Sequence, residues 1–265
     1  WRRKEKAKYF NKKIEVTEKV YNFIKNSKKT LHTLDLTGAS NYIIEDLALK
    51  GCYTLEKITF PKNLGIIGYE AFSECTKIQT LEIPSSVTEI KERAFENCRS
   101  VSSITFTEGS NLRTIGSWAF YNNHSLTRIE IPEGVETIGD IAFYGCDFLE
   151  ELILPSTINS IGENGFAECS NVQQMRVNAP TPPDIQSNTF DKVSRNIEFI
   201  VPKEAIEAYS QHKYWREFVP TTKLENVVKD YKIFTQNGTL HIEGAETDYQ
   251  IHDISGQLVY SGNAT

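Results

Sequence analysis

Five cysteines recur at nearly equal intervals along the chain: Cys52, Cys75, Cys98, Cys146 and Cys169. Thiolates bind zinc or pair as disulfides, so these residues are the first candidates for chemistry. None of them forms a C-x-x-C pair, and no histidine clusters with them, which disfavours a zinc site. Their spacings of 23, 23, 48 and 23 residues indicate equivalent places in a repeat.

Equivalent cysteines in stacked repeats form an internal column. A free cysteine is among the most buried residue types and packs as a small hydrophobe, so a reduced, structural column is the favoured interpretation. Disulfides between neighbouring repeats are an alternative that the distance allows and the required dihedral disfavours. Metal binding is a further alternative, without supporting spacing.

Other residues with chemical potential do not combine into a catalytic pattern. No G-x-S-x-G, H-E-x-x-H, P-loop or G-x-G-x-x-G motif occurs. The histidines lie far apart, in different contexts: His32, His124, His212, His241 and His252. We therefore predict that the protein is not an enzyme and uses no cofactor or metal.

The charge is distributed unevenly over the 265 residues. Residues 1–29 carry eleven Lys or Arg against three acids, whereas the rest carries 18 bases and 32 acids. An acidic body argues against nucleic-acid binding. The basic start either contacts an anionic partner or is the solvated face of a terminal helix. No apolar stretch approaches the roughly 18 residues of a transmembrane segment.

The cysteine period is shared by short segments with apolar residues at their first, fourth and sixth positions. These segments are LHTLDLT (31–37), LEKITFP (55–61), IQTLEIP (78–84), VSSITFT (101–107), LTRIEIP (126–132), LEELILP (149–155) and VQQMRVN (172–178), with a degenerate copy, NIEFIVP (196–202). Alternation of this kind predicts strands that stack as a parallel sheet, about 4.8 Å apart. Because no repeat can bury its apolar side alone, the pattern predicts a solenoid.

A second feature of each repeat is an Ala-Phe pair three residues before the cysteine position. The aromatic column comprises Phe72, Phe95, Phe120, Phe143 and Phe166, with Leu49 as a weaker copy. In the one repeat that lacks the cysteine, Asn123 occupies its position. We interpret this segment as a short helical turn opposite the sheet, held by its Phe and Cys in the core.

The two ends have their own signals. Thr17 and the apolar Val20, Phe23 and Ile24 predict a helix over 17–29 that caps the first coil. A short helix with Ile206, Tyr209, Trp215 and Phe218 is expected to close the other end. Beyond it, turn signals at Asn237-Gly238 and Ser255-Gly256 predict β-hairpins.

These observations define an α/β repeat fold: a leucine-rich-repeat solenoid with a parallel sheet face, short helical turns opposite, helical caps and a small C-terminal hairpin segment. The predicted divisions are a basic segment and capping helix (1–30), a solenoid of about eight rungs (31–202), a C-terminal cap and linker (203–222) and a β-rich, incomplete segment (223–265).

Residues 31 to about 202 resemble the BspA-like leucine-rich repeats of bacterial surface proteins. The resemblance is clearest in two repeat sequences, IPSSVTEIKERAFENC and IPEGVETIGDIAFYGC. Lys91 replaces the usual Gly, Thr107 the usual Pro and Asn123 the usual Cys. The resemblance implies a secreted or cell-surface protein that takes part in adhesion. Residues 223–265, with Asp253, Ser255, Gly256 and Val259, resemble a truncated sorting domain of type IX secretion, which also implies export.

Binding residues are expected on the sheet face, where the side chains flanking each fourth position point outward. One predicted row is Thr33, Lys57, Thr80, Ser103, Arg128, Glu151 and Gln174, and the next is Asp35, Thr59, Glu82, Thr105, Glu130, Ile153 and Arg176. Interface hot spots favour Trp, Tyr and Arg, so Arg128 and Arg176 are the obvious anchors. Tyr69, Trp118 and Tyr144 are aromatic candidates on the turns.

The sequence favours an extracellular module that binds protein ligands, with host extracellular-matrix or serum proteins as candidate partners. The alternative is a structural spacer or assembly element of the cell envelope that has no foreign ligand. A glycan ligand would require stacked aromatic residues on the sheet face, which these rows lack.

Overall fold

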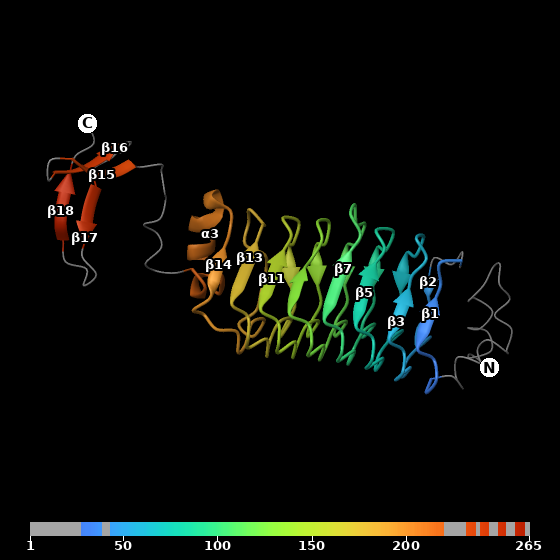
Figure 1. Ribbon diagram of the computed structural model, residues 1–265. Coiled ribbons are helices and arrows are strands. Elements are labelled where there is room, and N and C mark those ends of the chain that lie inside the picture. Colours follow the sequence, from blue (N-terminus) through green and yellow to red (C-terminus); the bar gives the residue numbers. More distant parts are fainter. Residues whose placement is uncertain are drawn as a thin grey trace. The chain divides into compact units, whose positions relative to one another are not determined.

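The computed structural model describes residues 28–38 and 43–219, together with the backbone of four strands between 232 and 262. The chain divides into two compact units, Trp1–Val219 and Pro220–Thr265. In the first unit, successive coils stack side by side from β1 to β14, forming the predicted solenoid (Figure 1).

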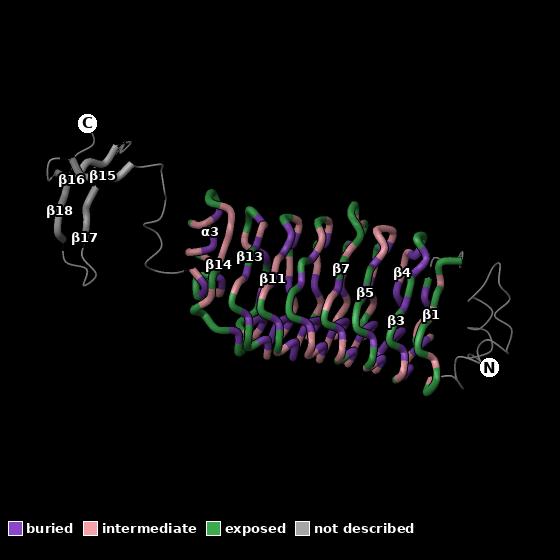
Figure 2. The backbone as a smooth tube through the Cα atoms, viewed as in Figure 1, coloured by how far each residue is buried: buried purple, intermediate pink, exposed green. Residues whose placement is uncertain are grey.

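The predicted parallel strands form one side of the solenoid. They are β1 (Thr33–Asp35), β3 (Lys57–Thr59), β5 (Thr80–Ile83), β7 (Ser103–Phe106), β9 (Arg128–Glu130), β11 (Glu151–Leu154), β13 (Gln174–Val177) and β14 (Glu198–Ile200). Their parallel pairs fall into three groups, β1-β3, β5-β7 and β9-β11-β13-β14. From β3 to β13, buried side chains alternate with exposed or half-buried ones along these strands, as the apolar pattern predicts (Figure 2).

A second row of strands runs through the coils and was not predicted. Its six strands pair in the order β12-β10-β8-β6-β4-β2. They are β2 (Ile43–Ile44), β4 (Ile66–Ile67), β6 (Glu89–Ile90), β8 (Thr114–Ile115), β10 (Thr137–Ile138) and β12 (Ser160–Ile161). Each ends on a buried isoleucine, and Gly commonly follows. A Cβ on Gly139 would lie 2.5 Å from the backbone nitrogen of Ser117, so glycine allows the close approach of neighbouring coils.

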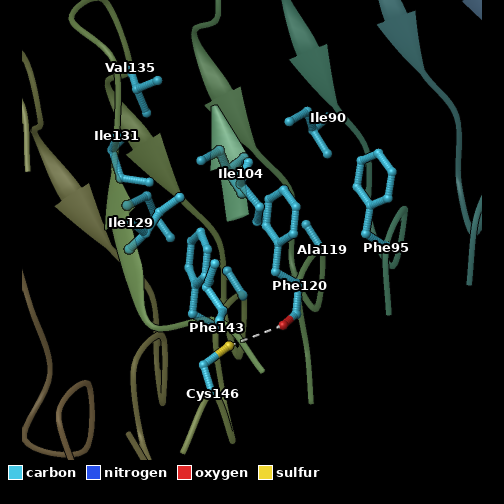
Figure 3. Packing of buried hydrophobic residues seen from close by; sticks show 14 of the residues in the cluster. Ile90, Phe95, Ile104, Ala119, Phe120, Ile129, Ile131, Val135, Phe143 and Cys146 are labelled. Carbon is cyan, nitrogen blue, oxygen red and sulfur yellow. Dashed lines mark hydrogen bonds between the residues drawn. The ribbon is translucent and has the colours of Figure 1, made fainter. Parts of the chain in front are cut away.

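The core is a stack of phenylalanine rings between the two strand rows. Phe95 and Phe120 lie 5.4 Å apart and Phe120 and Phe143 lie 5.0 Å apart, with nearly parallel rings. Figure 3 shows these rings beside the aliphatic residues of the strands. The five stacked rings, Phe72, Phe95, Phe120, Phe143 and Phe166, are fully buried, so each coil completes the core of its neighbours.

The cysteines form the predicted internal column. All five are free and buried. The thiols of Cys75, Cys98, Cys146 and Cys169 donate to carbonyl oxygens of the preceding coil, as Cys146 Sγ does to the Phe120 oxygen at 3.4 Å (Figure 3). Asn123 takes the same place, with Nδ2 donating to the Phe95 carbonyl oxygen at 2.9 Å. Burial raises the pKa of the Cys98 thiol, which keeps it protonated and unreactive.

The predicted helical turns are separate hydrogen-bonded turns rather than helix. Ala71 N donates to Gly68 O and Cys75 N to Phe72 O, whereas Phe72 N bonds to Ala94 O of the next coil. Glu70 and Glu74 have positive φ values of 49° and 63°. Residues with positive φ interrupt an α-helix. Alternate backbone amides therefore donate to carbonyl oxygens of the next coil and not within their own turn.

Two columns of left-handed residues therefore run along the turns. The first contains Leu47, Glu70, Arg93, Trp118, Ile141 and Asn164, and the second contains Gly51, Glu74, Asn97, Asn122, Gly145, Glu168 and Lys192. Gly and Asn suit this conformation, whereas a β-branched residue is strained there.

The solenoid ends in the predicted C-terminal cap. After β14 come the 3-10 segment Lys203–Ala205, helix α3 (Ile206–Gln211) and the 3-10 segment Trp215–Glu217. Tyr209, Trp215 and Phe218 are buried, and the Trp215 indole nitrogen donates to the Pro183 carbonyl oxygen at 2.8 Å. The predicted helix over 17–29 lies outside the described residues except for Lys28 and Lys29, which belong to a turn.

The second unit contains two antiparallel hairpins. β15 (Lys232–Gln236) pairs with β16 (Thr239–Glu243), and β17 (Tyr249–His252) pairs with β18 (Leu258–Gly262). Because Gln236 pairs with Thr239, the two strands are connected by two residues, Asn237 and Gly238, as the turn signal predicts.

Removing one ring from the core should weaken the solenoid. Phe120→Ala is expected to lower the free energy of unfolding by about 3 to 5 kcal/mol, because it opens a cavity between Phe95 and Phe143. Phe148→Ala is the matched control: Phe148 is 56% exposed, and its loss should cost less than about 0.5 kcal/mol. Urea denaturation followed by circular dichroism measures both, and equal losses would contradict the assigned core.

Backbone strain at Ile141 should be removable. Ile141 (φ 60°) and Asn164 (φ 53°) occupy the same column in adjacent coils. A left-handed β-branched residue costs roughly 1 to 2 kcal/mol, so Ile141→Asn should raise the free energy of unfolding by about 1 kcal/mol. The reverse change, Asn164→Ile, should lower it by a similar amount. Thermal denaturation of both variants checks this, and a stabilising Asn164→Ile would disprove it.

Candidate functional site: the sheet face and the turn face

The outward side chains of β1 to β14 form a surface that we call the sheet face. The register aligns Thr80 with Ser103, and Arg128 with Glu151 and Gln174, in one row. In the other row, Glu130 lies beside Ile153. Lys57, Thr59, Thr80, Glu82, Thr105, Arg128, Glu130 and Arg176 are exposed, and Ser103, Glu151, Ile153 and Gln174 are half-buried. The predicted residues thus share one surface.

Arg128 is held by its neighbours on the sheet face. Its Nε lies 2.7 Å from Glu151 Oε2, and its Nη2 lies 2.8 Å from Glu130 Oε2. These carboxylates, Glu130 first, raise the pKa of Arg128. A ligand that used this guanidinium would have to compete with both, so Arg128 is a weaker anchor than the sequence suggests.

Arg176 is the more available guanidinium. It is exposed on β13, and in the part of the chain that the structure describes it makes no ion pair. It lies opposite Ile153 and Ile200, which are both half-buried. Arg176 therefore combines a free charge with two apolar neighbours.

The outer surface of the Ala-Phe turns, which we call the turn face, carries an aromatic cluster. The Trp118 and Tyr121 ring centroids lie 4.8 Å apart, and those of Tyr121 and Tyr144 lie 5.6 Å apart. The Arg93 guanidinium lies 4.7 Å from the Trp118 ring centroid. All four side chains are half-buried. We call Arg93, Trp118, Tyr121 and Tyr144 the turn-face patch.

The sequence identified only part of this patch. Trp118 and Tyr144 were predicted candidates, and both belong to it. Tyr121 was missed, although it follows Phe120 as Tyr144 follows Phe143, and that shared place in the repeat was the available signal. Tyr69, the third aromatic candidate, lies outside the patch and donates its hydroxyl to Glu70 Oε1 at 3.1 Å.

Carboxylates on the turn face differ along the solenoid. In the earlier coils they are paired: Glu70 with Lys50, and Glu92 and Glu96 with Arg93. In the later coils Glu163, Glu168 and Asp191 make no ion pair with a described residue. These three later carboxylates therefore differ from Glu70, Glu92 and Glu96, which each have an ion-pair partner.

Neither a metal-ligand cluster nor a membrane-spanning helix occurs among the described residues. No group of three or more His, Cys, Asp or Glu side chains among them is placed to hold a metal ion. Within the same residues, no helix has the length and apolar content of a membrane span.

Comparison with known proteins agrees with this architecture. The model of the BspA type leucine-rich repeat region matches in six copies, over residues 21–125 and 107–216. No curated protein matches the chain. Repeats of the matched family are a general protein-interaction or surface module of bacterial proteins.

Solved leucine-rich repeat proteins are similar in structure. One from Bacteroides ovatus is 22% identical with a TM-score of 0.46, and the match covers 63% of this chain and 46% of that protein. One from T. pallidum is 26% identical with a TM-score of 0.44, covering 54% of this chain and 78% of that protein. The chain thus spans about half the length of the Bacteroides ovatus protein. From its repeat matches, the chain belongs to the BspA-type leucine-rich repeat family.

Proposed function

We propose that this protein is an extracellular or cell-surface module that binds proteins of a host or of neighbouring cells through its solenoid surface. The observation that carries the proposal is the sheet face, where polar side chains from successive strands stand in register on a rigid, fully packed support. Rigid strands lose little conformational freedom when a ligand binds, which favours affinity.

Arg176 is the proposed anchor of the sheet face. Its guanidinium is exposed and uncompensated among the described residues, and the half-buried Ile153 and Ile200 lie on either side. Arginine with apolar neighbours is a common composition of interface hot spots. Arg128 instead contributes to the shape of the face through its bonds to Glu130 and Glu151.

The proposal is tested by binding to an array of host extracellular-matrix proteins, serum proteins and glycans. We expect saturable binding to a protein, and Arg176→Glu should weaken it by at least about tenfold, the loss of a moderate hot spot. Arg99→Glu is the matched control, because Arg99 is also exposed and lies outside the sheet-face strands.

Two outcomes would overturn parts of the proposal. Binding that survives Arg176→Glu and Arg128→Glu would move the site off the sheet face. Failure to bind any protein, together with self-association in analytical ultracentrifugation, would favour the envelope-spacer alternative.

We also propose a location outside the cytoplasm, with residues 223–265 acting in export by type IX secretion. The support is the two hairpins of the second unit and the Asp253, Ser255, Gly256 and Val259 pattern. An antibody against the solenoid should label intact cells of the source bacterium. Labelling that requires permeabilised cells would disprove the surface location.

A further inference from the structure

We propose that the turn-face patch is a second binding surface, and that its ligand is an arginine-rich segment of a partner protein. This inference rests on the proposed protein-binding function and adds a surface and a ligand chemistry to it. It depends on the turn face alone, so it can fail while binding through the sheet face stands.

The composition of the patch points to a binding role. Trp118, Tyr121 and Tyr144 come from adjacent coils and are all half-buried, whereas the stacked rings of the same coils, Phe120 and Phe143, are fully buried. Partly exposed Trp and Tyr in contact with one another are typical of interface hot spots. The core does not need these rings, because the phenylalanine stack is complete without them.

Arg93 shows which chemistry the patch accepts. Its guanidinium stacks over the Trp118 ring at 4.7 Å, and its nitrogens lie 3.3 Å from Glu92 Oε1 and 3.4 Å from Glu96 Oε1. A planar cation between an aromatic face and carboxylates is a favourable arrangement for arginine. In the coil of Tyr144, Ile141 occupies the column position that Arg93 holds two coils earlier. That position of the turn therefore supplies no cation there.

The charge around Tyr144 supports a cationic ligand. Burial is the main cause that raises the pKa of Tyr144, and the nearby Glu168 and Asp191 raise it further. Glu163, Glu168 and Asp191 form no ion pair with any described residue. An arginine side chain from a partner would therefore find aromatic rings and unpaired carboxylates together, as Arg93 does in the earlier coil.

The experiment uses the whole chain and a fluorescently labelled oligoarginine peptide, with oligolysine and oligoglutamate as comparison peptides and anisotropy as the readout. We expect oligoarginine to bind more tightly than oligolysine, because guanidinium stacks on aromatic rings better than ammonium does. Trp118→Asn and Tyr144→Ala should each weaken oligoarginine binding by about fivefold. Both replacements copy residues of the same columns, Asn164 and Ala167, so the fold should tolerate them.

Arg93→Asn provides a test in the opposite direction. It removes the internal guanidinium from Trp118 and frees Glu92 and Glu96, so oligoarginine should bind up to about fivefold more tightly. A purely structural role of the patch would not produce tighter binding. Tyr53→Ala is the matched control, because Tyr53 is an exposed tyrosine outside the patch that bonds to Glu74, and it should leave binding unchanged.

Several results would overturn the proposal. In one such result, oligoarginine and oligolysine bind equally well, and neither Trp118→Asn nor Tyr144→Ala changes the affinity. That would show that the peptides are held only by electrostatic attraction to the acidic protein. A neutral oligosaccharide that binds and is lost in these variants would assign the patch to glycans instead. Absence of oligoarginine binding at low ionic strength, while the array ligand still binds through Arg176, would remove this inference and leave the proposed function intact.

Discussion

Every feature of the solenoid depends on one constraint: a single coil cannot bury its own apolar side. Its Phe is covered on both flat sides by the Phe of the coils before and after it, as Phe120 is by Phe95 and Phe143. Stability is therefore shared between neighbours, and each coil must present its ring at the same height and angle. The ends need substitutes, which Tyr209, Trp215 and Phe218 provide after the last strand.

That constraint also creates the two surfaces. Because the core positions recur with the coil, the residues between them must recur as well, and they form outward rows on the strands and on the turns. On the turns, left-handed residues such as Glu70 and Trp118 orient the backbone so that alternate amides donate hydrogen bonds to the next coil. The same geometry that joins the coils therefore places Trp118, Tyr121 and Tyr144 in contact at the surface.

Electrostatics then distinguishes residues that look equivalent in the sequence. Arg128 and Arg176 both stand on the sheet face, yet Arg128 is bonded to Glu130 and Glu151 and Arg176 has no such partner among the described residues. Exposed ion pairs add little stability, so the Arg128 network mainly orders its side chains. The turn face shows the same contrast between Glu92 and Glu96, which pair with Arg93, and Glu168, which has no ion pair within the described part of the chain.

By itself, the sequence determined the repeat, the buried Phe and Cys columns, the outward rows of the sheet face and the C-terminal hairpin at Asn237-Gly238, because periodicity and turn chemistry are local properties. It predicted short helical turns for the Ala-Phe segments, and it contained no strong signal for the two-residue strands such as β8 or for the left-handed Ile141. Only the tertiary structure decided those, together with the partners of Arg128 and the contact of Arg93 with Trp118. The physical reason is that each of these features depends on hydrogen bonds or contacts between residues of different coils, more than twenty positions apart in the chain. The sequence of one coil does not specify which groups of the neighbouring coil will be its partners.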